Sequence, residues 1–267
     1  MSYGFRAANA NGIVNIDEDS VSYVYLGKQV LTGEVTISCV GYPLIFFELP
    51  YNVTNNTSND GRYYDIKNVA GVAMKRLRPH PSTPNTWIAT FFTTILSTMY
   101  IRVFGKLHLN FPNGAGQSYG ARAWNSQGQL IFDTGCRQLR LTGNTYDTEI
   151  LINSRFPPNY GAATNGDTAL GMPFNLAGKS IMANTRGTIR VPYATGTFFD
   201  PGIGRDVYTY DYPEIESIFS ASGNTLYSRK SYANSSTFER PGDQITVVQY
   251  DINFYTRVAL IDNNLFP

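Results

Sequence analysis

Asp133 lies in the stretch whose residue types come closest to a catalytic motif. In "LIFDTG" (residues 130–135) an apolar run ends in Asp, Thr and Gly, an order that can hold one of two aspartates that share a proton in acid–base catalysis. The counterpart in this chain would be Asp17, which is followed by Glu18 and Asp19 rather than by Thr and Gly. Because the second carboxylate lacks these positioning residues, we expect no proteolytic activity. We expect Asp133 instead to end a strand and to leave the core for solvent.

A second segment, "GMPFNLAGKS" (residues 171–180), resembles a phosphate-binding loop only in part. Gly178, Lys179 and Ser180 match the end of that pattern. Six residues separate the two glycines where the pattern needs four, and its first glycine position holds Pro173, which has no N–H to offer a phosphate. We therefore expect no nucleotide and no other cofactor here.

The chain offers few metal ligands and no strongly basic surface. We expect its two histidines, His80 and His108, to be exposed, because a zinc site needs several donors close together. Asp17 and Asp19 in "NIDEDS" lack the glycine and closing glutamate of an EF-hand loop. Basic residues cluster only at "KRLR" (residues 75–78) and the net charge is +1, which favours a solvated strand edge over a nucleic-acid site. No catalytic residue, metal ligand or nucleic-acid partner is predicted.

The composition favours strands and contact surfaces. Aromatic residues reach 14% while charged residues are only 15%, a palette that suits β-sheets better than helices. The opening "MSYGFRAANANG" has no signal-peptide core, and no window is apolar enough for a membrane helix. We therefore expect synthesis in a cytoplasm, no membrane insertion, and two cysteines, Cys39 and Cys136, that are thiols rather than a disulfide.

One phrase of the sequence appears twice, 116 positions apart (119 minus 3). "YGFRAANANGIVNIDED" begins at Tyr3, and "YGARAWNSQGQLIFDTG" begins at Tyr119. Seven positions match without a gap, and further similarity follows at Gly27 and Gly143 and between "EVTI" (34–37) and "EILI" (149–152). Internal similarity of this kind indicates a duplicated unit.

Each copy of the phrase has the pattern of a β-hairpin. Asn9 and Gly12 in the first copy, and Asn125 and Gly128 in the second, take the first and fourth places of a turn. Asn can hydrogen-bond the backbone two residues on, and Gly accepts a positive φ without a Cβ clash. We predict a type I turn closed by the glycine, with a strand on each side.

Strand patterns continue along the chain, and they predict an all-β fold. Residues 34–50 read as two strands about a break at 41–43, and residues 248–260 alternate apolar and polar side chains, as in a half-buried antiparallel strand. The alternation also extends through residues 101–111, with His108 on the polar face. We expect two antiparallel β-sandwich-like units, copies of a hairpin-initiated module, at residues 1–112 and 113–267. The segment "PNGAGQS" (112–118) is the expected linker or long turn.

A Gly- and Pro-rich loop at residues 156–178 is the expected contact with a partner. Connections of this length without secondary structure are usually functional or covered by another chain. Its apolar side chains are too many for a solvated linker, and we expect them to be buried against another subunit. These candidate contact residues are Phe156, Tyr160, Leu170, Met172 and Phe174.

The repeated phrase resembles a segment of known proteins. The pattern Tyr-Gly-x-x-x-x-Asn-x-x-Gly-x-x-x-x-Asp, at Tyr3–Asp17 and Tyr119–Asp133, is similar to one found in small virion structural proteins of tailed bacteriophages, in tail, collar or fibre-associated components. The resemblance covers about 16 residues in each copy and brings no catalytic residues. It implies a β-rich virion module, made in the host cytoplasm and then assembled into a particle.

We therefore expect a structural virion protein that is homo-oligomeric and is held to other virion proteins by edges and loops. The alternative is a receptor- or glycan-binding module that recognises a host surface ligand. In that alternative five tyrosines would stack on the ligand and hydrogen-bond to it. They are Tyr208, Tyr210, Tyr212, Tyr227 and Tyr232.

Overall fold

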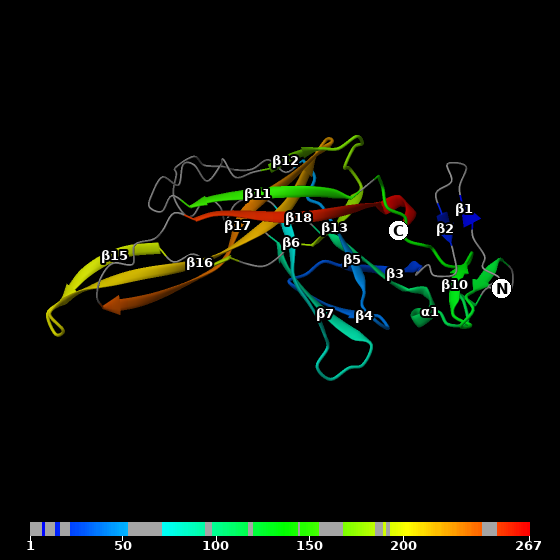
Figure 1. Ribbon diagram of the computed structural model, residues 1–267, viewed down its shortest axis with the longest axis horizontal. Coiled ribbons are helices and arrows are strands. Elements are labelled where there is room, and N and C mark those ends of the chain that lie inside the picture. The colour runs from blue at the N-terminus through cyan, green and yellow to red at the C-terminus, as the bar shows by residue number, and fades with distance from the viewer. Residues whose placement is uncertain are drawn as a thin grey trace.

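The chain folds almost entirely into antiparallel β-structure, as the sequence predicts (Figure 1). The computed structural model describes residues 7–8, 14–16, 22–52, 71–93, 98–116, 120–143, 145–154, 168–184, 189–190, 193–241 and 250–267. The helices in these ranges, α1 (Leu107–Asn110) and η3 (Asn263–Leu265), have four and three residues.

Two large sheets form the body of the protein. The six-stranded sheet has the order β11 (Tyr146–Ser154), β18 (Tyr250–Asp262), β13 (Lys179–Asn184), β5 (Leu44–Glu48), β8 (Tyr100–Lys106) and β3 (Tyr23–Val30). The eight-stranded sheet has the order β12 (Thr168–Gly171), β17 (Thr225–Pro241), β16 (Arg205–Ser222), β6 (Val72–Pro79), β7 (Thr86–Thr93) and β4 (Glu34–Ser38). The two remaining strands of this sheet, β14 (Ile189–Arg190) and β15 (Tyr193–Asp200), lie outside that order and both pair with β16.

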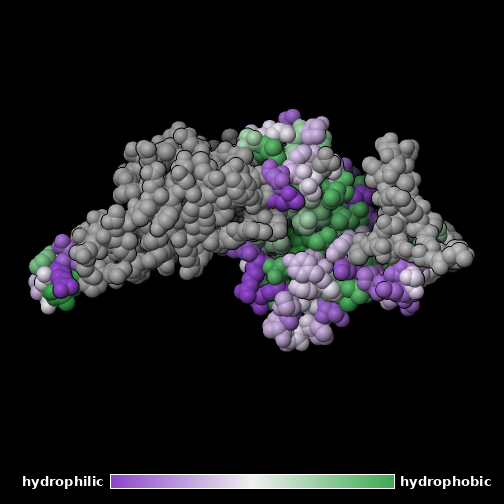
Figure 2. Space-filling view, in the orientation of Figure 1, coloured by the Kyte–Doolittle hydropathy of each residue, from purple (hydrophilic) through white to green (hydrophobic). Residues whose placement is uncertain are grey.

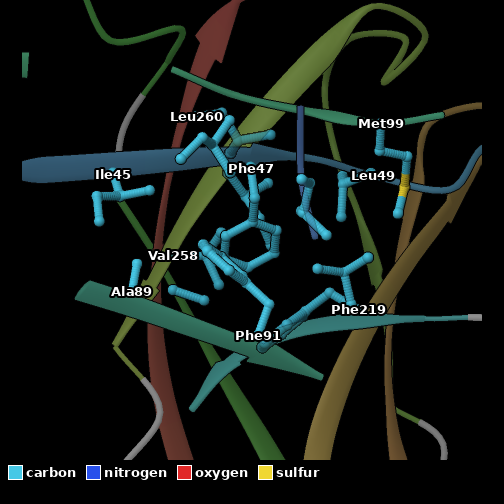
Figure 3. Packing of buried hydrophobic residues seen from close by; sticks show 14 of the residues in the cluster. Ile45, Phe47, Leu49, Ala89, Phe91, Met99, Phe219, Val258 and Leu260 are labelled. Carbon is cyan, nitrogen blue, oxygen red and sulfur yellow. The ribbon is translucent and has the colours of Figure 1, made fainter. Parts of the chain in front are cut away.

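The main core lies between these two sheets (Figure 3). Phe47 from β5 and Phe91 from β7 meet edge to face, with ring centroids 6.0 Å apart. Val258 and Leu260 from β18 and Phe219 from β16 are fully buried in the same cluster. Because inward-facing side chains from both sheets interdigitate, the body is a two-layer sandwich.

A second cluster covers the outer face of the six-stranded sheet. Phe46 and Phe104 meet edge to face at 5.4 Å, and Phe266, just after η3, packs on Phe104 at 4.9 Å. Ala259 and Ile261 of β18 belong to this cluster. The prediction of a half-buried strand is therefore wrong for the last part of β18, which is buried on both faces because the C-terminal residues fold over it.

The break predicted near Gly41 carries the chain from one sheet to the other. β4 ends before it and pairs with β7, whereas β5 begins after it and pairs with β8 and β13. Gly41 has a φ of 81°, a conformation that Gly adopts without strain.

The predicted alternation through residues 101–111 ends earlier than expected. β8 stops at Lys106, and residues 107–110 form the single turn α1. Arg102, which was expected on a polar face, is buried. Its guanidinium donates to the Phe266 carbonyl oxygen at 2.6 Å and to Glu48 Oε1 at 2.8 Å, and these hydrogen bonds compensate for the loss of water. A buried network thus replaces the solvent that the pattern implied.

The expected boundary between residues 112 and 113 does not separate two cores. β13 pairs with β5 at Ile181 and Phe47, and β16 pairs with β6 at Phe219 and Val72. Strands from both sides of the boundary therefore complete both sheets. The main core likewise contains residues from both parts.

An arm built from β15, β16 and β17 extends from the sandwich (Figure 1). β16 and β17 have 18 and 17 residues, and a strand of that length spans roughly 60 Å at about 3.3 Å per residue. Ile218, Phe219 and Ala221 bury one end of β16 in the body. The turn between β15 and β16 lies at the other end, far from the C-terminal residues (Figure 1).

Candidate functional site

Both copies of the repeated phrase form two-stranded hairpins with the same register. β1 (Ala7–Ala8) pairs with β2 (Val14–Ile16) through Ala7↔Ile16 and Ala8↔Val14. β9 (Arg122–Trp124) pairs with β10 (Leu130–Asp133) through Ala123↔Phe132 and Trp124↔Leu130. Adding 116 to the residue numbers of these β1–β2 pairs gives the residue numbers of the β9–β10 pairs. The two sequences therefore specify the same local fold, including the register shift in the middle of the hairpin.

The repeat does not extend beyond the hairpins. Gly27 lies inside β3, whereas Gly143 lies in the loop before β11. Residues 34–37 belong to an edge strand of the eight-stranded sheet, and residues 149–152 belong to an edge strand of the six-stranded sheet. These later similarities correspond to different places in the fold.

The turn of the second hairpin is closed by Gly128, which has a φ of 74°. Its N–H donates to the Asn125 carbonyl oxygen at 3.0 Å. The Asn125 side-chain Oδ1 accepts from the N–H groups of Gln127 at 3.1 Å and Gln129 at 2.8 Å. Asn9 and Gly12 lie outside the described residues.

Asp133 is buried, so the prediction that it faces solvent is wrong. The residue is only 2% exposed. Its Oδ1 accepts from the Gly135 N–H at 2.7 Å, and its Oδ2 accepts from the Ala115 N–H at 2.9 Å and from Arg122 Nε at 3.1 Å. Residues 112–116, the described part of the expected linker 112–118, fold back so that Ala115 reaches the carboxylate. Asp133 thereby fastens this segment to both strands of the hairpin.

The hydrogen bonds to Asp133 decide its protonation. Burial raises the pKa of Asp133, but the donors from Gly135, Ala115 and Arg122 outweigh burial and hold the pKa below its usual range. The carboxylate is therefore ionised and its oxygens are occupied. Thr134 is occupied too, because its Oγ1 accepts from the Ala121 N–H at 3.0 Å. This geometry assigns the Asp-Thr-Gly segment a positioning role in the hairpin.

Two glycines permit this close packing around Asp133. A Cβ on Gly114, which has a φ of 83°, would collide with Asp133 Oδ2 and would lie 2.6 Å from Arg122 Nε. A Cβ on Gly120 would collide with the Thr134 hydroxyl. Residues larger than glycine are therefore excluded at both positions unless the site shifts.

A pocket of about 370 Å³ opens beside the hairpin. Phe132, Leu265 and Phe266 form apolar walls, and Arg137, Gln138 and Arg140 add polar groups. The Nε2 of Gln138 is buried and has no hydrogen-bond partner among the described residues. Both arginines are exposed, and no ion pair joins either of them to another described side chain. The pocket can thus receive an apolar group that carries a hydrogen-bond acceptor or a negative charge.

Sequence reasoning missed this pocket because its two sides are far apart in the chain. The basic residues follow the second hairpin, whereas Leu265 and Phe266 lie in and after η3. An antiparallel bridge between Val24 and Gln138 holds the first side against β3. The spacing of Arg137 and Arg140 was the only sequence signal available.

The residues of the partial phosphate-loop match have structural partners. Lys179 Nζ pairs with Asp262 Oδ2 at 2.6 Å, and the Ser180 hydroxyl donates to Asn263 Oδ1 at 2.6 Å. Together they join the start of β13 to the end of β18 and to η3.

His80 follows β6, and His108 lies in α1. His80 Nδ1 accepts from the Ser82 and Thr83 N–H groups in a turn. Burial, with a smaller effect of nearby Lys106, lowers the pKa of His108 in α1. Cys39 and Cys136 are free thiols. Within the described ranges, no three His, Cys, Asp or Glu residues gather closely enough to hold a metal ion.

The structure corrects one of the predicted partner contacts and leaves others outside its description. Met172 is buried in the main core of its own chain, so its side chain is not available to a partner. Leu170 and Phe174 pack partly against the same core, and Leu170 sits opposite Leu226 in β17. Phe156 and Tyr160 lie outside the described residues.

The tip of the arm carries exposed apolar side chains. Phe199 is 62% exposed and Ile203 is 51% exposed. The turn between them is well defined, because the Gly202 N–H donates to Asp200 Oδ1 at 2.8 Å and the Gly204 N–H donates to the Asp200 carbonyl oxygen at 2.9 Å. Large apolar residues held this far from the core are typical of a contact surface.

The five tyrosines of the alternative hypothesis lie on β16 and β17. Of their side chains the structure describes that of Tyr227, which is half-buried beside the body end of the arm.

No protein-family model, curated protein or solved structure matches this chain. Neither α1 nor η3, the helices of the described ranges, has the length to span a membrane.

Proposed function

We propose that this chain is a structural component of a tailed-bacteriophage virion, in a tail, collar or fibre-attachment position, that acts through protein–protein contacts. The observation that carries the proposal is the duplicated hairpin. Its sequence resembles virion segments of this class, and its two copies keep the same register. Asp133, which ends the phrase in the second copy, then serves to fasten its hairpin rather than to catalyse a reaction.

Two further features support a role in contacts. The outer side of β3 is bridged at Val24 by Gln138, but the other end strands of the two sheets, β4, β11 and β12, each pair on one side with a named strand. Such edges pair readily with other chains. The arm places Phe199 and Ile203 in solvent, where a neighbouring protein can cover them. A stable contact of this kind buries at least about 1,000 Å² in total.

Immunogold labelling tests the position of the chain. An antibody against the purified chain should label one discrete site on tailed particles purified from the culture that makes it. A density map of those particles should then accommodate the sandwich and its arm at that site. Particles that carry no label, while the free chain accumulates in the same lysate, would contradict the proposal.

Limited proteolysis separates the proposal from the receptor-binding alternative. We expect residues 159–167, which lie outside the described residues, to be cut in the free chain and protected in the particle. Equal cleavage in both forms would favour a module whose loop waits for a host ligand. Binding of the free chain to a glycan array would favour the same alternative.

A further inference from the structure

We propose that the arm tip of one copy docks into the hairpin-side pocket of a second copy, so that the chain associates head to tail. This inference rests on the proposed role in protein–protein contacts and names the partner. The tip consists of Phe199, Ile203 and Asp206, and the pocket is the cavity lined by Phe132, Arg137, Gln138, Arg140, Leu265 and Phe266.

The tip presents an apolar ring and a carboxylate on one face. Phe199 and Asp206 are direct register partners across β15 and β16. Residues directly opposite in an antiparallel pair point to the same face, with their Cβ atoms about 5 Å apart. Figure 2 shows hydrophobic and hydrophilic atoms together at this end of the molecule. Asp200 and Arg205 form the next register pair toward the turn, so these two residues and Asp206 together carry a net charge of −1.

The pocket is complementary to this tip in shape. Its volume is about 370 Å³, and a cavity of about 150 Å³ is already large enough to hold a benzene molecule. A phenyl ring therefore fits with room for neighbouring atoms. Phe132, Leu265 and Phe266 supply the apolar walls, and Leu265 is 48% exposed in the free chain.

The pocket is also complementary to the tip in charge and hydrogen bonding. Arg137 and Arg140 give it two positive charges, while the negative charge of Asp133 is already paired with Arg122. A carboxylate entering beside the ring would meet these guanidinium groups. An acceptor from the tip would also satisfy the buried Nε2 of Gln138, which otherwise lacks a hydrogen-bond partner among the described residues.

The two surfaces cannot meet within one chain. The tip lies at one end of the long axis, and the C-terminal residues that line the pocket lie toward the other end (Figure 1). A contact between different surfaces of identical chains is heterologous. Such contacts build closed rings when the rotation closes and open filaments when it does not.

Sedimentation velocity on two end-blocked variants tests the proposal. Phe199→Ser/Asp206→Lys blocks the tip, and Arg137→Glu/Arg140→Glu blocks the pocket. All four side chains are exposed or lie at the surface, so both variants should unfold at the same temperature as the wild type. The wild type should sediment as a series of species that grows with concentration, and each variant alone should associate at least tenfold more weakly.

A one-to-one mixture of the two variants gives the sharpest outcome. One variant keeps its pocket and the other keeps its tip, so the mixture should form dimers and stop there. The matched control Tyr42→Ser/Arg76→Glu changes an exposed aromatic residue and an exposed arginine elsewhere, and it should behave as the wild type.

A wild type that stays monomeric at all concentrations, or a mixture that stays monomeric, overturns head-to-tail docking. A tip variant that still associates while the pocket variant does not would also overturn it, and would assign the pocket to a different chain. Immunogold labelling does not depend on either end, so a failed mixture with labelled particles leaves the virion proposal standing.

Discussion

Replacing Asp133 with Asn should loosen the second hairpin selectively. The Asn Oδ1 can still accept from the Gly135 N–H, but Nδ2 would face two donors, the Ala115 N–H and Arg122 Nε. Each hydrogen bond to a charged group contributes about 1.5–3 kcal/mol. Arg122 is 28% exposed, so water replaces part of its contact. We therefore expect a loss of about 2–4 kcal/mol.

The loss should appear first in the segment that Asp133 fastens. Hydrogen exchange of the peptides that contain Ala115 and Gly135 should accelerate about 100-fold, since 1.4 kcal/mol corresponds to about tenfold. The matched control is Asp147→Asn. Asp147 also pairs with an arginine, Arg257, at 2.8 Å, but both side chains are about two-thirds exposed, and we expect no measurable change in unfolding or exchange.

The pH dependence of the stability difference between wild type and Asp133→Asn tests whether the carboxylate charge causes the loss. The pKa of Asp133 in the folded protein lies below its usual value, so its ionised form stabilises the hairpin above the unfolded pKa of about 3.9 and loses that effect as the pH falls through the folded pKa. The difference between wild type and Asp133→Asn should be largest near neutral pH and should shrink below about pH 4. Exchange that is unchanged in the variant, or a difference that does not depend on pH, would refute the reasoning.

Five other substitutions probe the fold by urea unfolding, two of them as comparisons. Gly128→Val should cost about 1–2 kcal/mol because its φ of 74° strains a β-branched residue, while Gly128→Asn should cost less; equal costs would contradict this. Met172→Ala should lower the free energy of unfolding by about 2–5 kcal/mol because it leaves a cavity in the core. Leu170→Ala should cost less because Leu170 is only half-buried. The reverse order would indicate that Met172 contacts a partner rather than the core. Arg102→Met should cost about 3 kcal/mol by leaving its acceptors unpaired, and a loss under about 1 kcal/mol would mean that water replaces the guanidinium.

Local chemistry explains what could be read from the sequence. The turn from Asn125 to Gly128 needs only four consecutive residues, because the Asn side chain and the glycine φ define it without help from the rest of the chain. The break near Gly41 was visible for the same reason. The class of the fold followed from β-branched and aromatic runs that have no helical period.

Pairing between residues far apart in the chain explains which features the sequence could not predict. Asp133 appeared to be a solvated strand end because nothing in its own strand shows that Ala115 folds back to donate to it. Met172 appeared to be available to a partner because its neighbours are Gly, Pro and Asn, yet β12 pairs with β17 and brings it into the core. The division at residue 112 failed because the partner of Phe47 is Ile181, far along the chain.

The central place of β18 sets the time at which the nascent protein can close its core. β18 lies between β11 and β13, and its Leu260 packs in the same cluster as Phe47 of β5. These residues are 213 positions apart (260 minus 47), which a ribosome covers in roughly 10–40 s at 5–20 residues per second. During that interval β5 and β8 have been made, but the sheet that should cover them is incomplete. We therefore expect the growing chain to be more prone to aggregation than the finished one, and slower translation to lower its yield unless chaperones bind the exposed strands.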